Sequence, residues 1–294
     1  MKIVGNRIGF IGAGNMGRPM IRHLVAAGHA VGVSVRRREM FAQVEALGAT
    51  VAHSPAAAAS GAEFVLLNVT ATEDVETVLF GEGGAAETMV PGCVCIDFST
   101  ISPAASARFA EHLRARGVDF LDAPVSGGIR GAEAATLSIM VGGAADALEK
   151  ARPLLLCLGE KITHIGPSGA GQVAKACNQI IQVINIQGIA EAMLYASRMD
   201  ADPARVLEAI SAGMAGSKML DLMGPKMIAR DFIAGIEARL HAKDIALVAG
   251  ATQDLCIEMP ATEAVHRQLA RLVDLGWGRD DTSSLLRVLE VQAV

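Results

Sequence analysis

A glycine-rich turn near the N-terminus has the spacing of a dinucleotide-phosphate site. The sequence reads Gly9-Phe-Ile-Gly12-Ala-Gly14-Asn-Met-Gly17-Arg-Pro-Met20. In such a motif Gly12 permits the tight turn, Gly14 lets the backbone approach a pyrophosphate, and Gly17 lets a helix pack closely on a strand. The positive N-terminus of that helix would hold the phosphates. A glycine loop without a ligand is the alternative, and the flanking pattern of strand and helix disfavours it.

Arginines follow the second expected strand, where many NAD-binding proteins carry an acidic residue for the ribose hydroxyls. Here Val35 is followed by Arg36-Arg37-Arg38. Guanidinium groups bind a phosphate through paired hydrogen bonds and stack on adenine. Arg36 and Arg37 therefore predict NADP as the cofactor, with NAD as the alternative. The run is also compatible with a solvated basic start of the next helix.

A lysine leads a polar stripe on a long apolar segment. Gly171, Lys175, Asn178, Gln182 and Asn185 follow one another at spacings of four, three, four and three, so they share one helix face. An ammonium group buried without a partner is costly. The stripe is either a satisfied buried network or the lining of a substrate cleft, and its place after a nucleotide-binding domain favours the cleft.

Two glycine-containing stretches offer further backbone donors. They are Asp122-Ala-Pro-Val-Ser126-Gly127-Gly128 and the segment 168–171. Exposed amides beside a hydroxyl group can hold a carboxylate. An ordinary Pro/Gly turn explains both stretches as well, and the residues alone favour that interpretation.

Strands and helices that alternate over the first half of the chain must position these groups. The expected strands are 7–11, 30–35, 64–69, 93–98, 118–121, 136–141 and 161–165, and the expected helices are 15–27, 38–47, 72–79, 103–116 and 144–157. This alternation predicts an α/β domain with a parallel, doubly wound sheet over residues 1–166.

Beyond residue 166 the pattern is helical. The expected helices are 172–198, 203–211, 240–255, 261–275 and 283–291. The first of them is long and apolar on most faces, which predicts a buried helix. We therefore expect an all-α second domain over residues 167–294, built around a long connecting helix.

Composition narrows the function classes. The 294 residues are 51% hydrophobic and 19% charged, with a net charge of −5 and no long basic run. A nucleic-acid or membrane partner is therefore not expected. Apolar stretches stay shorter than the ~18 residues of a membrane span, and no signal-peptide pattern is present. These features predict a soluble, cytoplasmic protein that binds small molecules.

The five cysteines lie in apolar segments and are predicted to be reduced core residues. The pair Cys93 and Cys95 has a spacing that also occurs in metal sites. It lies in an expected strand without a cluster of partners, so no metal site is predicted.

Four motifs together are similar to those of one family. They are the segments 9–20 and 122–128, Thr136-Leu-Ser-Ile-Met-Val-Gly-Gly143, and Gly169-Ala-Gly-Gln-Val-Ala-Lys175-Ala-Cys-Asn178-Gln179. Through them the sequence resembles the beta-hydroxyacid dehydrogenases over nearly its whole length. The resemblance implies a Rossmann-type domain and a helical domain, with catalysis in the cleft between them. The segments 178–179, 185–192 and 240–244 most resemble members that reduce tartronate semialdehyde.

The resemblance also implies roles for single residues. Lys175 takes the place of the catalytic lysine, Ser126, Gly127 and Gly128 that of the substrate-binding motif, and Asn178 or Gln179 that of a substrate-holding residue. The expected cofactor-binding residues are Gly12, Gly14, Asn15, Met16, Gly17, Arg36, Arg37, Val69, Thr70, Asp74, Thr100 and Lys243. Thr70 replaces the family's usual proline, and Gln179 stands where many members have a second asparagine.

The function expected is that of an NADP-preferring oxidoreductase that interconverts a small aldehyde acid and its hydroxy acid. Lys175 would act as general acid in reduction and as general base in oxidation. The alternatives are 3-hydroxyisobutyrate or another short semialdehyde as substrate, imine reduction, and a nucleotide-dependent scaffold; Lys175 disfavours the last two. The large apolar helical domain predicts a homodimer or homotetramer.

Overall fold

The computed structural model describes residues 5–292, which form two compact units that divide between Lys175 and Ala176. This division lies within the long helix α8 (Ala170–Arg198). The expected domains, 1–166 and 167–294, meet just before α8, whereas the observed units meet within it. The two divisions therefore differ in whether residues 167–175 belong to the first or the second unit.

The first unit is built on a mostly parallel sheet. Its strands are β1 (Arg7–Ile11), β2 (Ala30–Ser34), β3 (Thr50–Ala52), β4 (Phe64–Leu67), β5 (Val94–Asp97), β6 (Asp119–Asp122), β7 (Val125–Ser126), β8 (Leu137–Gly142) and β9 (Gly159–Gly166). Their order is β3-β2-β1-β4-β5-β6-β8-β7, with β9 paired to β8. Strands β1 to β6 are parallel, whereas β8 is antiparallel to β6 and β7. The predicted doubly wound sheet is confirmed.

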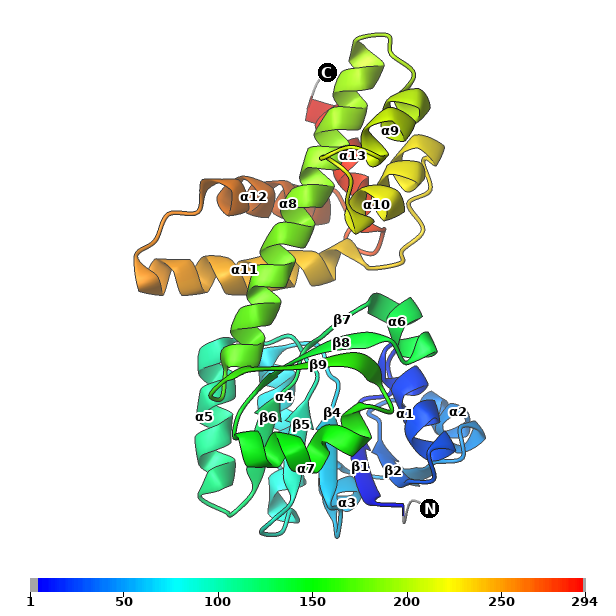
Figure 1. Ribbon diagram of the computed structural model, residues 1–294. Coiled ribbons are helices and arrows are strands. Elements are labelled where there is room, and N and C mark those ends of the chain that lie inside the picture. The colour runs from blue at the N-terminus through cyan, green and yellow to red at the C-terminus, as the bar shows by residue number, and fades with distance from the viewer. Residues whose placement is uncertain (1–4, 293–294) are drawn as a thin grey trace. The chain divides into compact units, whose positions relative to one another are not determined.

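Helices cover both faces of this sheet (Figure 1). They are α1 (Gly17–Ala26), α2 (Phe41–Ala46), α3 (Pro55–Ala59), α4 (Thr72–Phe80), α5 (Pro103–Arg114), α6 (Gly128–Ala134) and α7 (Ala145–Leu155), with short 3-10 helices at Arg38–Met40 and Ala85–Glu87. Apolar side chains of α1, α2, α6 and α7 share one core cluster, and those of α3, α4 and α5 share another.

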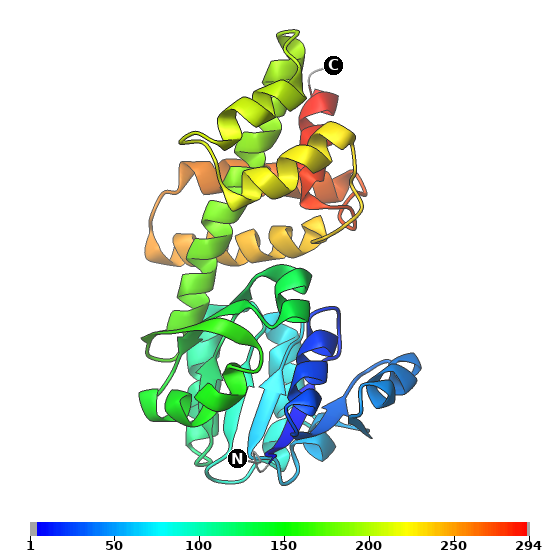
Figure 2. The same cartoon turned by 45° about the vertical axis from the view of Figure 1, so that its right-hand side comes forward.

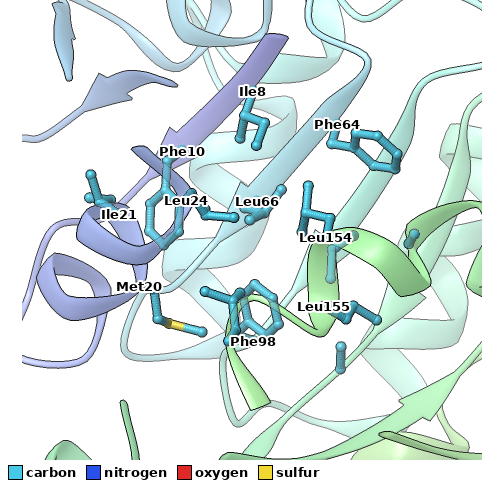
Figure 3. Close-up of a cluster of buried hydrophobic side chains, with 14 of the residues drawn as sticks. Ile8, Phe10, Met20, Ile21, Leu24, Phe64, Leu66, Phe98, Leu154 and Leu155 are labelled. Carbon is cyan, nitrogen blue, oxygen red and sulfur yellow. The ribbon is translucent and has the colours of Figure 1, made fainter. Parts of the chain in front are cut away.

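Alternate residues of the central strands feed these two clusters. In β4, Phe64 and Leu66 belong to the first cluster, and Val65 and Leu67 belong to the second. Figure 3 shows part of the first cluster, in which Leu24 of α1 and Leu154 of α7 lie near these strand residues. A strand buried on both faces is therefore apolar throughout, as expected of a parallel sheet. The result is a rigid base for the loops at its edge.

The second unit is helical (Figure 2). It contains most of α8, followed by α9 (Pro203–Ser211), α10 (Lys218–Ala229), α11 (Ala238–Leu255), α12 (Pro260–Asp274), the 3-10 helix η3 (Thr282–Ser284) and α13 (Leu285–Gln292). The helices pack around one apolar core. The sequence pattern does not predict α10 in this unit, because Gly224 and Pro225 interrupt its apolar periodicity, nor the short helices α3 and α6 of the first unit.

Two expectations about burial hold for only part of the residues concerned. Cys93 and Cys95 are buried as predicted, and burial raises the pKa of Cys93 to about 11, but Cys177 and Cys256 are exposed. Helix α8 is buried along much of its length, with Val183, Ile186 and Met193 in the core of the helical unit, but its side chains Ile181 and Tyr195 are exposed. The apolar content of a segment therefore does not tell which of its side chains are buried.

No helix in the range 5–292 has both the length and the hydrophobicity to cross a membrane. Within the same range, no group of three or more His, Cys, Asp or Glu side chains is arranged to hold a metal ion.

Candidate active site

The register of the parallel strands brings four loops to one edge of the sheet. Ile11 is paired with Ser34 and with Leu67, and Leu67 is paired with Asp97. The segments that follow β1, β2, β4 and β5 therefore leave the sheet at the same level. This carboxyl edge is where open α/β sheets bind their ligands.

Two glycines of the turn after β1 are required by the protein itself. Gly12 has a φ of +101°, and a Cβ atom there would lie 2.3 Å from the Asn68 carbonyl oxygen. A Cβ atom on Gly17 would lie 2.2 Å from the Gly12 carbonyl oxygen. Gly14 differs, because a Cβ atom there would meet no protein atom within 4 Å. Its lack of a side chain leaves open space beside the turn, as the approach of a ligand needs.

The start of α1 suits an anion. No side chain caps this helix end, and its first turn contains no acidic residue. Asn15 is exposed and accepts a hydrogen bond from Arg18, and Met16 is half-buried. The helix end therefore offers positive potential beside open space, which a phosphate group fits.

Arg36 and Arg37 leave the sheet next to this turn. The Gly12 amide donates to the carbonyl oxygen of Ser34, the last residue of β2, over 3.0 Å. Both arginines are exposed, and Arg37 has a loose contact of 3.9 Å with Glu39. No acidic residue stands between Ser34 and Arg38. Two exposed guanidinium groups therefore follow the strand that is bonded to the glycine-rich turn.

The loops after β4 and β5 are joined to each other. The Val69 amide donates to Ser99 Oγ over 3.0 Å. Val69 and Thr100 are half-buried and Thr70 is exposed. The Asp74 carboxylate accepts a hydrogen bond from the Ala71 amide over 3.1 Å, so it fixes the start of α4. Val69, Thr70 and Thr100 thus lie on loops of the same edge as the glycine turn.

Lys175 lies beside the segment that contains Ser126. Its Nζ donates to the Val125 carbonyl oxygen over 3.0 Å, and the residue is 9% exposed. Ser126 is half-buried, and the main chain then turns through Gly127 and Gly128, with φ values of +136° and +61° that favour glycine. Residues about 50 positions apart in the sequence are thereby brought together.

Sequence reasoning missed the residues that hold this arrangement. Asp122 is fully buried and accepts hydrogen bonds from the amides of Gly169 and Gln172. Burial raises the pKa of the Asp122 carboxyl group, and its backbone hydrogen bonds oppose that rise. The Gln172 side chain bonds the main chain at Ser99 and Ile101. An acidic residue at the end of a buried strand and a glutamine one turn before the lysine were the available signals.

The predicted residues of the second unit form a network of their own. Asn178 donates to Gln179 Oε1 over 2.8 Å, and Gln179 donates to Asp244 Oδ2 over 2.6 Å. The ammonium group of Lys243 lies 2.9 Å from Asp244 Oδ1. Asn178, Gln179 and Lys243 are therefore linked through Asp244, a residue that the sequence did not single out. His241 is buried, and its Nδ1 lies 2.7 Å from Thr282 Oγ1.

Comparisons with known proteins agree with this geometry. A family model described as the NAD-binding domain of 6-phosphogluconate dehydrogenase matches residues 7–166. A second, described as the NAD-binding domain of NADP-dependent 3-hydroxyisobutyrate dehydrogenase, matches residues 169–289.

Similar proteins extend over the whole chain. The chain is 38% identical to 2-hydroxy-3-oxopropionate reductase of Escherichia coli K12, over 98% of each protein. It is 37% identical to 3-hydroxyisobutyrate dehydrogenase of Pseudomonas aeruginosa, over 86% of this chain and 87% of that protein. The structure of Mycobacterium tuberculosis 3-hydroxyisobutyrate dehydrogenase with L-serine matches with a TM-score of 0.90 and 30% identity, over 97% of this chain and 99% of that one.

The two family models together match nearly all of the chain, and the Escherichia coli relative matches it over almost the full length of both proteins. The protein is thus an oxidoreductase that uses a nicotinamide cofactor and acts on CH–OH groups. The chain belongs to the NAD(P)-dependent beta-hydroxyacid dehydrogenase family.

Proposed function

We propose that this protein is an NADP-preferring reductase of a short aldehyde acid, with tartronate semialdehyde (2-hydroxy-3-oxopropionate) as its substrate. The observation that carries the proposal is the hydrogen bond of 3.0 Å between Lys175 Nζ and the Val125 carbonyl oxygen. It holds the ammonium group next to the segment that continues into Ser126 and the Gly127-Gly128 turn, and these groups together would donate a proton and bind a carboxylate.

The cofactor would be held at the carboxyl edge of the sheet. Gly12, Gly14, Asn15, Met16 and Gly17 would bind its pyrophosphate, and Val69, Thr70 and Thr100 would line its nicotinamide half. Arg36 and Arg37 would bind a 2′-phosphate, which supports NADP over NAD. Lys243 is proposed as a further cofactor contact, and Asp74 as a residue that shapes the site by fixing α4. Bound NADPH would supply the hydride.

The chain's own residues would bind, orient and protonate the substrate. Ser126 and the amides of Gly127 and Gly128 would hold the carboxylate, and the ammonium group of Lys175 would protonate the alkoxide that forms at the aldehyde oxygen. In the opposite direction, neutral Lys175 would accept the hydroxyl proton. Fixing the carbonyl group in this way supplies much of the rate acceleration through orientation.

Amide groups favour a substrate that carries a hydroxyl group. Asn178 and Gln179 are linked to Gln182 and Asp244 by hydrogen bonds, and a substrate hydroxyl group would join this network, whereas a methyl branch would make no hydrogen bond to it. A site built to bond a hydroxyl group discriminates strongly against an analogue without it. The name of the Escherichia coli relative supports the same substrate.

3-Hydroxyisobutyrate is the second candidate substrate. It is supported by the Pseudomonas aeruginosa relative and by the structure from Mycobacterium tuberculosis, both of which are named 3-hydroxyisobutyrate dehydrogenase. The two candidates differ in the group that the amides of Asn178 and Gln179 would meet.

We also propose that the protein assembles as a homodimer or homotetramer through its helical unit. Ile181 and Tyr195 of α8, and Met199 directly after it, are 62% to 68% exposed. Exposed apolar side chains on one helix are a common mark of an interface. Light scattering of the purified protein tests this point.

Steady-state kinetics with two semialdehydes and two cofactors test the proposal. Tartronate semialdehyde and methylmalonate semialdehyde are each assayed with NADPH and with NADH. We expect the highest kcat/KM with tartronate semialdehyde and NADPH, and a ~10- to 100-fold preference for NADPH. Methylmalonate semialdehyde is the aldehyde form of 3-hydroxyisobutyrate, so a higher kcat/KM with it would favour the second candidate substrate. Equal kcat/KM values with NADPH and NADH would contradict the proposed cofactor preference.

A further inference from the structure

The first turn of α8 is clamped by a buried carboxylate. Asp122, the last residue of β6, accepts the Gly169 amide over 2.7 Å and the Gln172 amide over 2.9 Å, and it is fully buried. A Cβ atom on Gly171 would lie 2.5 Å from the Asp122 carbonyl oxygen. The helix therefore begins in direct contact with the strand, and its first turn cannot shift without loss of these bonds.

Gln172 joins the same turn to the loop after β5. Its Nε2 donates to the Ser99 carbonyl oxygen over 2.8 Å, and its Oε1 accepts the Ile101 amide over 3.1 Å. Ser99 in turn bonds the Val69 amide and the Asp97 carboxylate. Both polar ends of one buried side chain are thus used to bind the main chain on either side of Thr100.

Lys175 lies one helical turn after Gln172. Its Nζ donates to the carbonyl oxygen of Val125, three residues after Asp122. Two short segments, 122–125 and 172–175, are therefore tied together at both of their ends. These hydrogen bonds, together with those from Gln172 to the loop after β5, fix the position of Lys175 in the first unit.

We propose that Asp122 and Gln172 are positioning residues, which hold Lys175 at a fixed place relative to the loop around Thr100 without touching substrate or cofactor. This inference rests on the proposed role of Lys175 as proton donor. Reaction rates depend steeply on such placement, because a shift of about 1 Å can cost ~100-fold. Both residues are buried, so their effect reaches the reaction only through the parts that they hold.

Replacement of Gln172 gives the sharpest test. Gln172→Met keeps the length of the side chain and removes both hydrogen bonds. We expect kcat with NADPH to fall ~10- to 100-fold, the primary deuterium isotope effect on kcat to rise, and the Kd for NADPH to change less than about threefold. Hydrogen exchange should become faster in residues 165–175 of the protein without cofactor.

The matched control uses the same substitution on the same helix. Gln187 is also a buried glutamine of α8, and its Nε2 bonds Glu191 within the helix. Gln187→Met should leave kcat, the isotope effect and exchange in residues 165–175 unchanged. Equal losses in both variants would show a general weakening of α8 and would overturn the inference.

A second pair of variants covers the case in which Gln172→Met does not fold. Asp122→Asn keeps the shape of the side chain but turns an amide donor toward one of the two backbone amides. Asp281→Asn is its control, because Asp281 is a buried carboxylate that bonds the amides of Gly235 and Ser283 in the helical unit. We expect a lower kcat and faster exchange in residues 165–175 for Asp122→Asn alone.

The double variant separates this inference from the proposed function. In a Lys175→Ala background, Gln172→Met should lower kcat less than twofold further, because the group that it positions is gone. A fully additive loss would contradict positioning of the lysine. If Lys175→Ala alone keeps normal turnover, the proposed function fails; if it is inactive while Gln172→Met and Asp122→Asn are normal, only the positioning inference fails.

Discussion

The two halves of α8 hold their polar side chains in different ways. At its start, the hydrogen bonds of Asp122 and Gln172 run to main-chain groups of Gly169, Gln172, Ser99 and Ile101. Further along, in the helical unit, Asn178 and Gln179 bond other side chains, from Asn178 to Gln179 and Gln182 and from Gln179 to Asp244.

This difference separates a fixed part from an adaptable part. A side chain bonded to main chain cannot turn away without leaving a buried group unpaired, which costs about 1–3 kcal/mol. A network of side chains can exchange partners by rotation of its members, so it can accommodate a ligand. We infer that the lysine end of α8 needs accurate placement and that the amide end adapts to the substrate.

The largest effect should come from Lys175 itself. Lys175→Ala removes the proposed proton donor, and we expect kcat to fall ~10²- to 10⁴-fold with NADPH binding intact. Lys175→Arg should be similarly slow, because a guanidinium group retains its proton. Lys161→Ala is the control, since Lys161 lies exposed on β9. Near-normal turnover of Lys175→Ala would contradict the view that the start of α8 serves to place this lysine.

Substitution of Arg36, beside the glycine-rich turn, should change cofactor binding without changing the functions proposed for the two halves of α8. Arg36→Ala is expected to raise the KM for NADPH ~10- to 100-fold and to leave the KM for NADH unchanged, because only NADPH carries the 2′-phosphate. Arg114→Ala is a control at an exposed arginine in the last turn of α5. A parallel change with both cofactors would show that Arg36 does not read the phosphate.

A smaller effect is expected at the adaptable end. Asn178→Ala removes a donor to Gln179 and Gln182, and we expect the KM for tartronate semialdehyde to rise ~10-fold while kcat changes less. Asn185→Ala is the matched control on the same helix, because Asn185 bonds Ile181 and Ser217. If the two variants behave alike, Asn178 has no special part in substrate binding.

The smallest effect concerns stability of the helical unit. The side-chain hydrogen bonds of Arg230 lower the pKa of the Glu290 carboxyl group below its usual 4.5. A lowered folded-state pKa means that the pair stabilises the fold above pH 4.5 and that this contribution is lost as the pH falls through the folded pKa. The pair is partly exposed, so only ~0.2–1 kcal/mol is expected.

Glu290→Gln measures this contribution. The chain's single tryptophan, Trp277, lies in the helical unit and reports its unfolding by urea. The variant should be less stable than the original near neutral pH, and the difference should vanish in acid. A difference that persists in acid would assign the loss to packing.

The architecture could be predicted because its signals are local. Strands such as β4 are short apolar runs, and α9 begins with Asp202 and Pro203, which cap and start a helix. Strands β3 and β7 have three and two residues, too few to show a pattern. The ties of Asp122 and Gln172 join residues about 50 and 70 positions apart, and no local spacing reveals such contacts.

The candidate site divides along the same line. Gly12, Gly14 and Gly17 could be recognised from the sequence because all three lie within one short turn, whose geometry fixes their spacing. The partner of Gln179 is Asp244, on another helix, so it became visible only in the fold. The sequence also overestimated burial, because Cys177 and Ile181 belong to an apolar segment and are nevertheless exposed in the described chain.

The transfer of hydride to the proposed substrate tests the account most directly. The enzyme is incubated with tartronate semialdehyde and NADPH that carries deuterium at both positions of C4, and the product is analysed by mass spectrometry and NMR. The account predicts glycerate with one deuterium on its terminal carbon, and no such product from Lys175→Ala on the same time scale. NADPH that stays reduced, or glycerate without deuterium, would contradict the proposed reaction.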